Sequence, residues 1–158
     1  MKHRQSVAMA ISSAIVAMVI DAGTKRWAET SLGNAASRGG DLVQLRLSHN
    51  TGVAFGLVAD HGQLIGLLVP AVLIVLACVI IRSRPGATGW LGVGLLIGGG
   101  LANAADRLRD GRVTDFIDVG IAAQRWPTFN FADIFITLGC ALLVVDAYRA
   151  AARERNRA

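Results

Sequence analysis

Two aspartates stand where long apolar stretches meet polar sequence, Asp115 at residues 113–118 and Asp133 at residues 129–133. A carboxylate at the centre of a membrane helix costs about 2.5–3.5 kcal/mol, so membrane chains keep few of them and place those facing protein or water. Two carboxylates held close in a partly dry site cannot easily both ionise, so one keeps its proton while the other stays charged. Such a pair can activate water by general acid/base catalysis, and this is the chemistry that Asp115 and Asp133 indicate.

Amide and guanidinium side chains accompany the two aspartates. Asn103 and Arg107 are four residues apart, so on a helix they share one face and point toward one spot. Asn130 lies three residues before Asp133 and could bring a second amide to that spot, although it fits a helix N-cap equally well. Asn50 begins the sequence Asn-Thr-Gly, for which a turn is the favoured interpretation.

Asp21 and Lys25 are four residues apart near the end of the first apolar stretch. This spacing predicts a local ion pair that stabilises the helix end, and a chemical role is the less favoured alternative. We therefore expect Asp21 and Lys25 to form a structural ion pair.

The elements that position these side chains are predicted from hydropathy. The chain has 158 residues, of which 53% are hydrophobic and 17% are charged, and a mean hydropathy of +0.49. A helix needs about 20 residues to cross the hydrocarbon of a bilayer. The sequence predicts a mainly α membrane protein, a single integral-membrane domain over residues 1–158. Its four transmembrane helices are expected at about 6–27, 63–81, 87–105 and 131–148, with outer loops at about 28–62 and 106–130.

Orientation follows from the basic residues. The 16 Lys and Arg residues divide equally between the two sides, so their density near helix ends decides rather than their number. The dense segments hold Lys2, Arg4, Arg82, Arg84, Arg149, Arg153, Arg155 and Arg157. We therefore expect both termini in the cytoplasm and both long loops outside. Because this fringe accounts for half of the basic residues, the pI near 10.2 indicates no nucleic-acid site.

The first outer loop carries a strand signal. Val43, Leu45 and Leu47 alternate with polar residues, the pattern of a half-buried strand, and a second short strand is expected after the turn at residues 50–52. A small β element is predicted on the outer membrane surface. Residues 98–100 are glycines, so one face of the third helix lacks bulk and could admit another backbone or a substrate helix.

Four strings, taken together, resemble the lipoprotein signal peptidases, also called type II or prolipoprotein signal peptidases. They occur in the family's order at compatible spacing over residues 21–133, with Ala102 where the family usually has glycine. The matching strings are Asp21-x-x-Thr24-Lys25, Asn50-Thr51-Gly52-x-Ala54-Phe55, Asn103-x-x-Asp106-Arg107-x-x-x-Gly111-x-Val113-x-Asp115-Phe116 and Phe129-Asn130-x-Ala132-Asp133.

The resemblance implies an aspartic endopeptidase of the bacterial inner membrane that cleaves diacylglyceryl-modified prolipoproteins before the lipidated cysteine. It implies Asp115 and Asp133 as the catalytic pair, and a small extracytoplasmic β-sheet cradle near the periplasmic face. It assigns substrate binding or orientation of the pair to Asn50, Asn103, Arg107 and Asn130. No cofactor and no metal are implied, globomycin-type peptides are the expected inhibitors, membrane lipids surround the chain, and a monomer is the default.

Two rival classes use similar residues. A metal-dependent lipid phosphotransferase could hold Mg²⁺ with clustered acids, here Asp106, Asp110, Asp115 and Asp118. A small proton-coupled transporter would also carry carboxylates, but it would need polar residues deep within several helices, and these helices are nearly bare. Sensitivity to chelator distinguishes the first rival from the peptidase.

Overall fold

The computed structural model describes residues 3–33, 37–51, 62–83 and 85–156, and the expected second strand after residue 51 lies outside them. Four helices and four strands occur in this part of the chain. In chain order they are α1 (His3–Leu32), β1 (Arg38–Gly39), β2 (Val43–Asn50), α2 (Gly62–Arg82), α3 (Ala87–Asp110), β3 (Val113–Ile121), β4 (Gln124–Arg125) and α4 (Phe131–Arg155).

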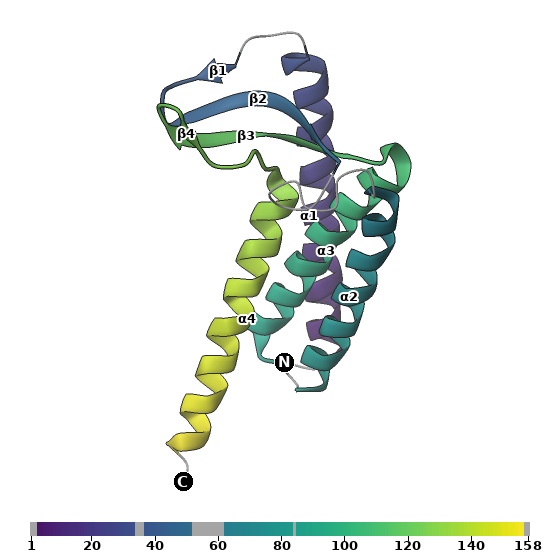
Figure 1. Ribbon diagram of the computed structural model, residues 1–158. Helices are drawn as coiled ribbons and strands as arrows, with labels where there is room; N and C mark the ends of the chain where they lie inside the picture. The colour runs from purple at the N-terminus through teal and green to yellow at the C-terminus, as the bar shows by residue number, and fades with distance from the viewer. Residues whose placement is uncertain (1–2, 34–36, 52–61, 84, 157–158) are drawn as a thin grey trace.

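The helices form a bundle in which α3 packs against α1, α2 and α4. The sheet covers one end of this bundle (Figure 1). Three helices are long and apolar enough to cross a membrane, over Arg4–Leu32, Ala87–Asp110 and Phe131–Arg155. The described part of α2 contributes a shorter apolar helix, Ala71–Arg82. The described part of the protein is therefore mainly helical, with three candidate spans and a small antiparallel sheet.

The helices run further than the hydropathy predicted. α3 continues five residues past Ala105 to Asp110, α4 ends at Arg155, and α1 ends at Leu32. Charged residues end an apolar span but not the backbone hydrogen bonding of a helix. What ends α3 is Gly111, which adopts a left-handed φ of 70° and donates its N–H to Arg107 O at 2.9 Å.

Glycines of α3 allow close helix contacts. A Cβ on Gly98 would lie 2.6 Å from Ala14 O in α1, and one on Gly99 would lie 2.5 Å from Ala132 O in α4. The glycine face is therefore filled by neighbouring helices. The hypothesis that this face admits a substrate helix is wrong, because the space that side chains would take is already occupied by neighbouring helices.

The sheet is antiparallel, with strand order β1-β2-β3-β4. The predicted strand around Val43 to Leu47 is confirmed as β2. Its main partner β3 lies in the segment 106–130 that we expected to be a loop. Charged residues along that segment obscured the strand, since Asp115 and Asp118 are buried within it rather than solvated.

The sheet joins the helices through a small apolar core. Phe116 of β3 is buried against Ala28 and Leu32 of α1, and its ring meets Trp27 edge-on at 6.3 Å between centroids. The chain before α4 also adds to the sheet, because Phe129 N–H donates to Ile117 O at 3.0 Å. This pairing brings the start of α4 beside the middle of β3.

Candidate active site

Asp115 lies on β3 at the inner end of the sheet, and only 2% of it is exposed. Its Oδ1 accepts a hydrogen bond from Asn130 Nδ2 at 2.7 Å, and its Oδ2 accepts one from Asn50 Nδ2 at 3.3 Å. Asn50 ends β2 and lies diagonally across the strand pair, since its direct partner is Val113. Asn50 is thus a strand residue that contacts Asp115, and the turn expected at residues 50–52 extends beyond the described residues.

Asp133 lies in the first turn of α4 and is half-buried. Its Oδ1 accepts a hydrogen bond from Asn103 Nδ2 at 2.8 Å. Its Oδ2 accepts the N–H of Asn130 at 3.2 Å, while its own N–H donates to Asn130 Oδ1 at 3.1 Å. This reciprocal pair of bonds is a capping box at the start of α4.

Asn130 connects the two carboxylates. It is fully buried, and besides its cap and its bond to Asp115 its Nδ2 donates to Asn103 Oδ1 at 3.1 Å. The sequence left open whether Asn130 is an N-cap or a site residue, and the structure makes it both. Asp115, Asp133, Asn103 and Asn130 therefore form one hydrogen-bonded group, although they come from three separate elements.

Asp21 and Lys25 form an ion pair with 2.6 Å between Lys25 Nζ and Asp21 Oδ2. The pair is buried and also contacts other helices. Lys25 Nζ donates to Asn103 Oδ1 at 2.9 Å and lies 2.8 Å from Asp106 Oδ2, and Asp21 Oδ1 accepts the N–H of Ala132 at 2.8 Å. Sequence spacing predicts contacts within one helix only, so it gave no sign of these links from α1 to α3 and α4.

Arg107 is buried on α3, with 8% exposed. It lies within electrostatic range of three carboxylates, those of Asp133, Asp115 and Asp106. The expected convergence of Asn103 and Arg107 on one region therefore occurs. A positive charge at this position stabilises negative charge on the aspartates.

Burial changes the acidity of Asp115. Desolvation, with the negative charge of Asp133 second, raises the pKa of Asp115 from 3.8 to about 7, although the hydrogen bonds from Asn130 and Asn50 oppose the rise. Asp115 can therefore hold a proton near neutral pH. A carboxyl that keeps its proton near neutral pH can act as a general acid.

The other acids of the second loop segment have cationic partners. Asp110 pairs with Arg109 at 2.7 Å, and Asp118 pairs with Arg125 at 2.9 Å. Across the described ranges, no group of three or more His, Cys, Asp or Glu side chains is arranged to hold a metal ion. In the described residues Asp106, Asp110 and Asp118 thus pair with Lys and Arg side chains.

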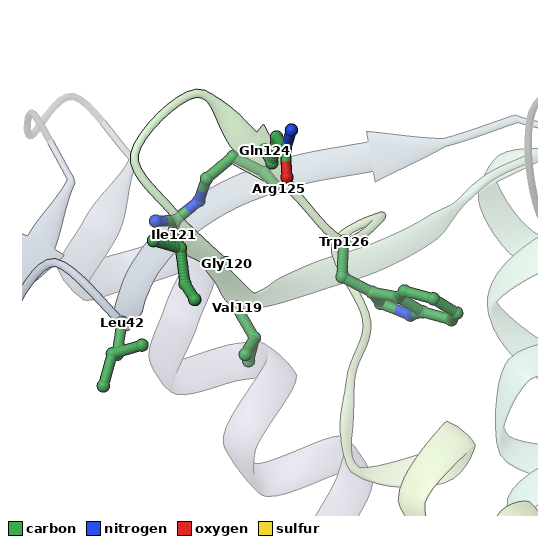
Figure 2. A pocket seen from close by; sticks show the side chains of 7 residues that line it. All are labelled: Leu42, Val119, Gly120, Ile121, Gln124, Arg125 and Trp126. Carbon is green, nitrogen blue, oxygen red and sulfur yellow. The ribbon is translucent and has the colours of Figure 1, made fainter.

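Asp133 lines a groove of about 570 Å³ that runs along α4. The other residues that line it are mostly apolar, namely Trp126, Phe129, Ile134, Thr137, Leu138 and Ala141. A second hollow, of about 480 Å³, lies at the β3–β4 hairpin, where Figure 2 shows Leu42, Val119 and Ile121 beside Arg125. Because that hollow has none of the paired carboxylates, the groove at Asp133 is the candidate route to the site.

Sequence reasoning missed one further contact beside the pair. Thr114, next to Asp115, is buried and its Oγ1 donates to Glu29 Oε1 of α1 at 2.7 Å. Neither residue belongs to a spacing pattern, so only the folded chain reveals that this bond fixes β3 against α1.

A bundle of apolar helices that holds one buried and one half-buried aspartate under a small sheet fits a membrane-bound aspartic hydrolase. Residues 13–149 match the family described as signal peptidase (SPase) II. A lipoprotein signal peptidase of Gloeobacter violaceus is 37% identical over 146 residues, covering 89% of this chain and 82% of that relative. One of Serratia proteamaculans is 33% identical over 149 residues, covering 89% and 86%.

Solved structures agree with these relatives. A bacterial membrane enzyme solved at 2.3 Å superposes with a TM-score of 0.80 at 25% identity, covering 92% of this chain and 91% of its own. A second, solved at 1.9 Å, gives a TM-score of 0.76 at 26% identity, covering 87% and 91%. The chain belongs to the signal peptidase II family, an aspartic peptidase family, and is a membrane-bound protease.

Proposed function

We propose that this protein removes the signal peptide from diacylglyceryl-modified prolipoproteins by cleaving before the lipidated cysteine, with Asp115 and Asp133 activating water. The family and its relatives support the cleavage of lipoprotein signal peptides. The observation that carries the two-aspartate mechanism is the bonding of Asn130 to both residues, which ties β3 to the start of α4.

In this mechanism Asp115 begins protonated and Asp133 begins ionised. Burial of Asp115 and its raised pKa of about 7 support the first assignment. Exposure of Asp133 to the groove, together with donors from Asn103 and from the N–H of Asn130, supports the second.

Hydrolysis then follows by proton transfers alone. Asp133 takes a proton from water, the hydroxide oxygen attacks the scissile carbonyl carbon, and Asp115 gives its proton to the carbonyl oxygen. When the tetrahedral intermediate collapses, Asp115 takes that proton back and Asp133 gives its own to the leaving amine. No covalent enzyme intermediate forms, and both carboxyls return to their starting states.

The surrounding polar residues position substrate and pair. Asn50 and Asn130 orient Asp115, and Asn103 orients Asp133. Arg107 interacts with a substrate carbonyl or a lipid headgroup, which its burial close to both aspartates supports. We propose that no metal or cofactor takes part, that globomycin-type peptides compete for the site, and that the protein works as a monomer among membrane lipids.

Four helices cross the bacterial inner membrane in this proposal, and residues 1–158 form one domain. The 21 residues of α2 reach about 31 Å at 1.5 Å per residue, which is enough to cross the hydrocarbon. The start of α1 and the end of α4 lie at the end of the bundle away from the sheet (Figure 1). That arrangement supports cytoplasmic termini and a site near the periplasmic face, where a lipidated cysteine meets the end of its signal helix.

The test is a cleavage assay on a lipid-modified proprotein in detergent. Wild type is compared with Asp115→Asn and Asp133→Asn, each with and without EDTA. Either substitution is expected to abolish cleavage in a protein that still folds, and EDTA is expected to have no effect. Turnover retained by either variant refutes the pair, and loss of wild-type activity in EDTA favours the metal-dependent rival.

A further inference from the structure

Lys25 has an environment that an ion pair with Asp21 does not explain. It lies on α1 with 5% exposed, and its Nζ contacts three acceptors: Asp21 Oδ2 at 2.6 Å, Asp106 Oδ2 at 2.8 Å and Asn103 Oδ1 at 2.9 Å. An ammonium has three protons to donate and accepts none. The ammonium thus pairs with two carboxylates, and it donates a hydrogen bond to Asn103, a residue that also contacts the proposed catalytic pair.

The contact with Lys25 decides which way the Asn103 side chain faces. Asn103 Oδ1 accepts from Lys25 Nζ and from Asn130 Nδ2, while Asn103 Nδ2 donates to Asp133 Oδ1 at 2.8 Å. A carboxamide rotated by 180° would set its NH₂ against the ammonium and its oxygen against the carboxylate. Both contacts would be repulsive, so the ammonium leaves one orientation only.

We propose that Lys25 is a positioning residue for the hydrolytic reaction, holding the Asn103 carboxamide in the orientation that donates to Asp133. This inference rests on the proposed function, because it gives Lys25 a task only if Asp133 is catalytic. In the contacts described above Lys25 forms a hydrogen bond with neither aspartate of the pair. Its charge also acts on Asp115, and its link to Asp133 runs through Asn103.

Asp21 completes the arrangement from the other side. Its Oδ2 holds Lys25, and its Oδ1 accepts the N–H of Ala132, the residue before Asp133. One carboxylate therefore fixes both the cation and the backbone that carries the proposed base. A pair that only stabilised the end of α1 would need neither the contact with Asn103, 78 residues away in sequence, nor that with Ala132.

The first variant is Lys25→Met, assayed as the full chain in detergent on a lipid-modified proprotein. Loss of orientation at Asp133 is expected to lower kcat by about 10²-fold, with KM within about twofold of wild type because no substrate contact is removed. Thermal unfolding is recorded for every variant. A purely structural role would instead lower the amount of folded protein and leave the kcat of that fraction unchanged.

A charge-matched variant tests whether a loss of kcat comes from unpaired buried charge rather than from the loss of the contact with Asn103. Lys25→Met leaves Asp21 and Asp106 without their shared cation, whereas Lys25→Met combined with Asp106→Asn keeps the local net charge at −1, as in wild type. The same loss of kcat is expected. The matched control is Arg109→Met, which removes another cation beside Asp106, at 4.0 Å, and Arg109 has no contact with Asn103 among those described. This control is expected to keep wild-type kcat.

A double-mutant cycle tests whether Lys25 acts through Asn103. Asn103→Ala is expected to lower kcat, and adding Lys25→Met to it is expected to cost less than about twofold more, since the amide to be oriented is already gone. Losses that multiply overturn the inference. The inference is also overturned if a folded Lys25→Met or Asn103→Ala protein keeps the wild-type kcat, or if only KM changes. Failure of both Lys25 variants to fold overturns it as well.

The same assay separates this inference from the function on which it rests. A wild-type protein that does not cleave the substrate, or an Asp133→Asn variant that does, refutes the proposed function and the inference with it. Cleavage that needs Asp133 but not Lys25 refutes the inference alone.

Discussion

Asn130 Nδ2 donates a 2.7 Å hydrogen bond to Asp115 Oδ1 from a position where Asn130 also caps α4. The same side chain thus starts a helix and fixes a buried carboxyl of the neighbouring sheet. Since Asp133 is the third residue of that helix, the cap sets the position of one proposed catalytic residue relative to the other. Helix capping and the geometry of the site therefore depend on one amide.

Replacing Asn130 separates its two tasks. Asn130→Ala loses both, so we expect about 1 kcal/mol less unfolding free energy from the missing cap and a loss of most turnover. Asn130→Ser is the matched comparison, because serine caps helices well but is too short to reach Asp115. We expect serine to recover most of the stability and little of the kcat. Equal recovery of both would contradict the role of the amide in orienting Asp115.

The raised pKa of Asp115 predicts how stability depends on pH. Because the folded pKa of about 7 exceeds the unfolded 3.8, folding takes up a proton between these values. This group's contribution is fully present below pH 4 and is lost as the pH rises through 7, at up to about 1.4 kcal/mol per pH unit. Asp115→Asn should therefore melt increasingly above wild type from pH 5 to pH 8. If the difference in melting temperature between Asp115→Asn and wild type does not grow with pH, the raised pKa of Asp115 is contradicted.

Asn50 should set the alkaline limit of activity. Its amide donates to the Asp115 carboxylate, which favours the charged form and opposes the raised pKa. Asn50→Ala should therefore raise the pKa of Asp115 further, and the alkaline limb of the kcat/KM profile, expected near pH 7 in wild type, should move to higher pH. The position of the limb is the quantity to measure, whatever happens to its height. A limb that stays in place or moves to lower pH would exclude Asp115 as the group that must keep its proton.

Glycine positions should differ in their tolerance of alanine. Gly98→Ala puts a Cβ 2.6 Å from Ala14 O, so we expect overpacking between α3 and α1 to cost about 1–3 kcal/mol. Gly23, on α1, has nothing within 4 Å of the place that an added methyl would take, and Gly23→Ala should be neutral or stabilising by up to about 1 kcal/mol. Unfolding of both variants in detergent, followed by tryptophan fluorescence, checks the contrast. Similar effects from the two changes would refute the close packing of α3 on α1.

Much of the architecture could be predicted from the chain because hydropathy and alternation are local properties. Apolar runs located the helices, and the alternation of Val43, Leu45 and Leu47 located β2. The helix ends and β3 were missed, because Asp106 to Asp110 continue a helix in spite of their charge and Asp115 and Asp118 are buried in a strand. Hydropathy predicts that charged residues lie in water, but ion pairs and hydrogen bonds offset the free-energy cost of burying these aspartates.

The sequence by itself determined which side chains are available for chemistry and that they lie at the borders of apolar segments. Spacing of three or four residues also related Asn130 to Asp133 and Asp21 to Lys25 within their own helices. Only the tertiary structure decided that Asn130 reaches Asp115 on β3 and that Lys25 reaches Asn103 on α3. Such contacts depend on how helices and strands pack against one another, and that packing is set by contacts between distant parts of the chain that no local spacing contains.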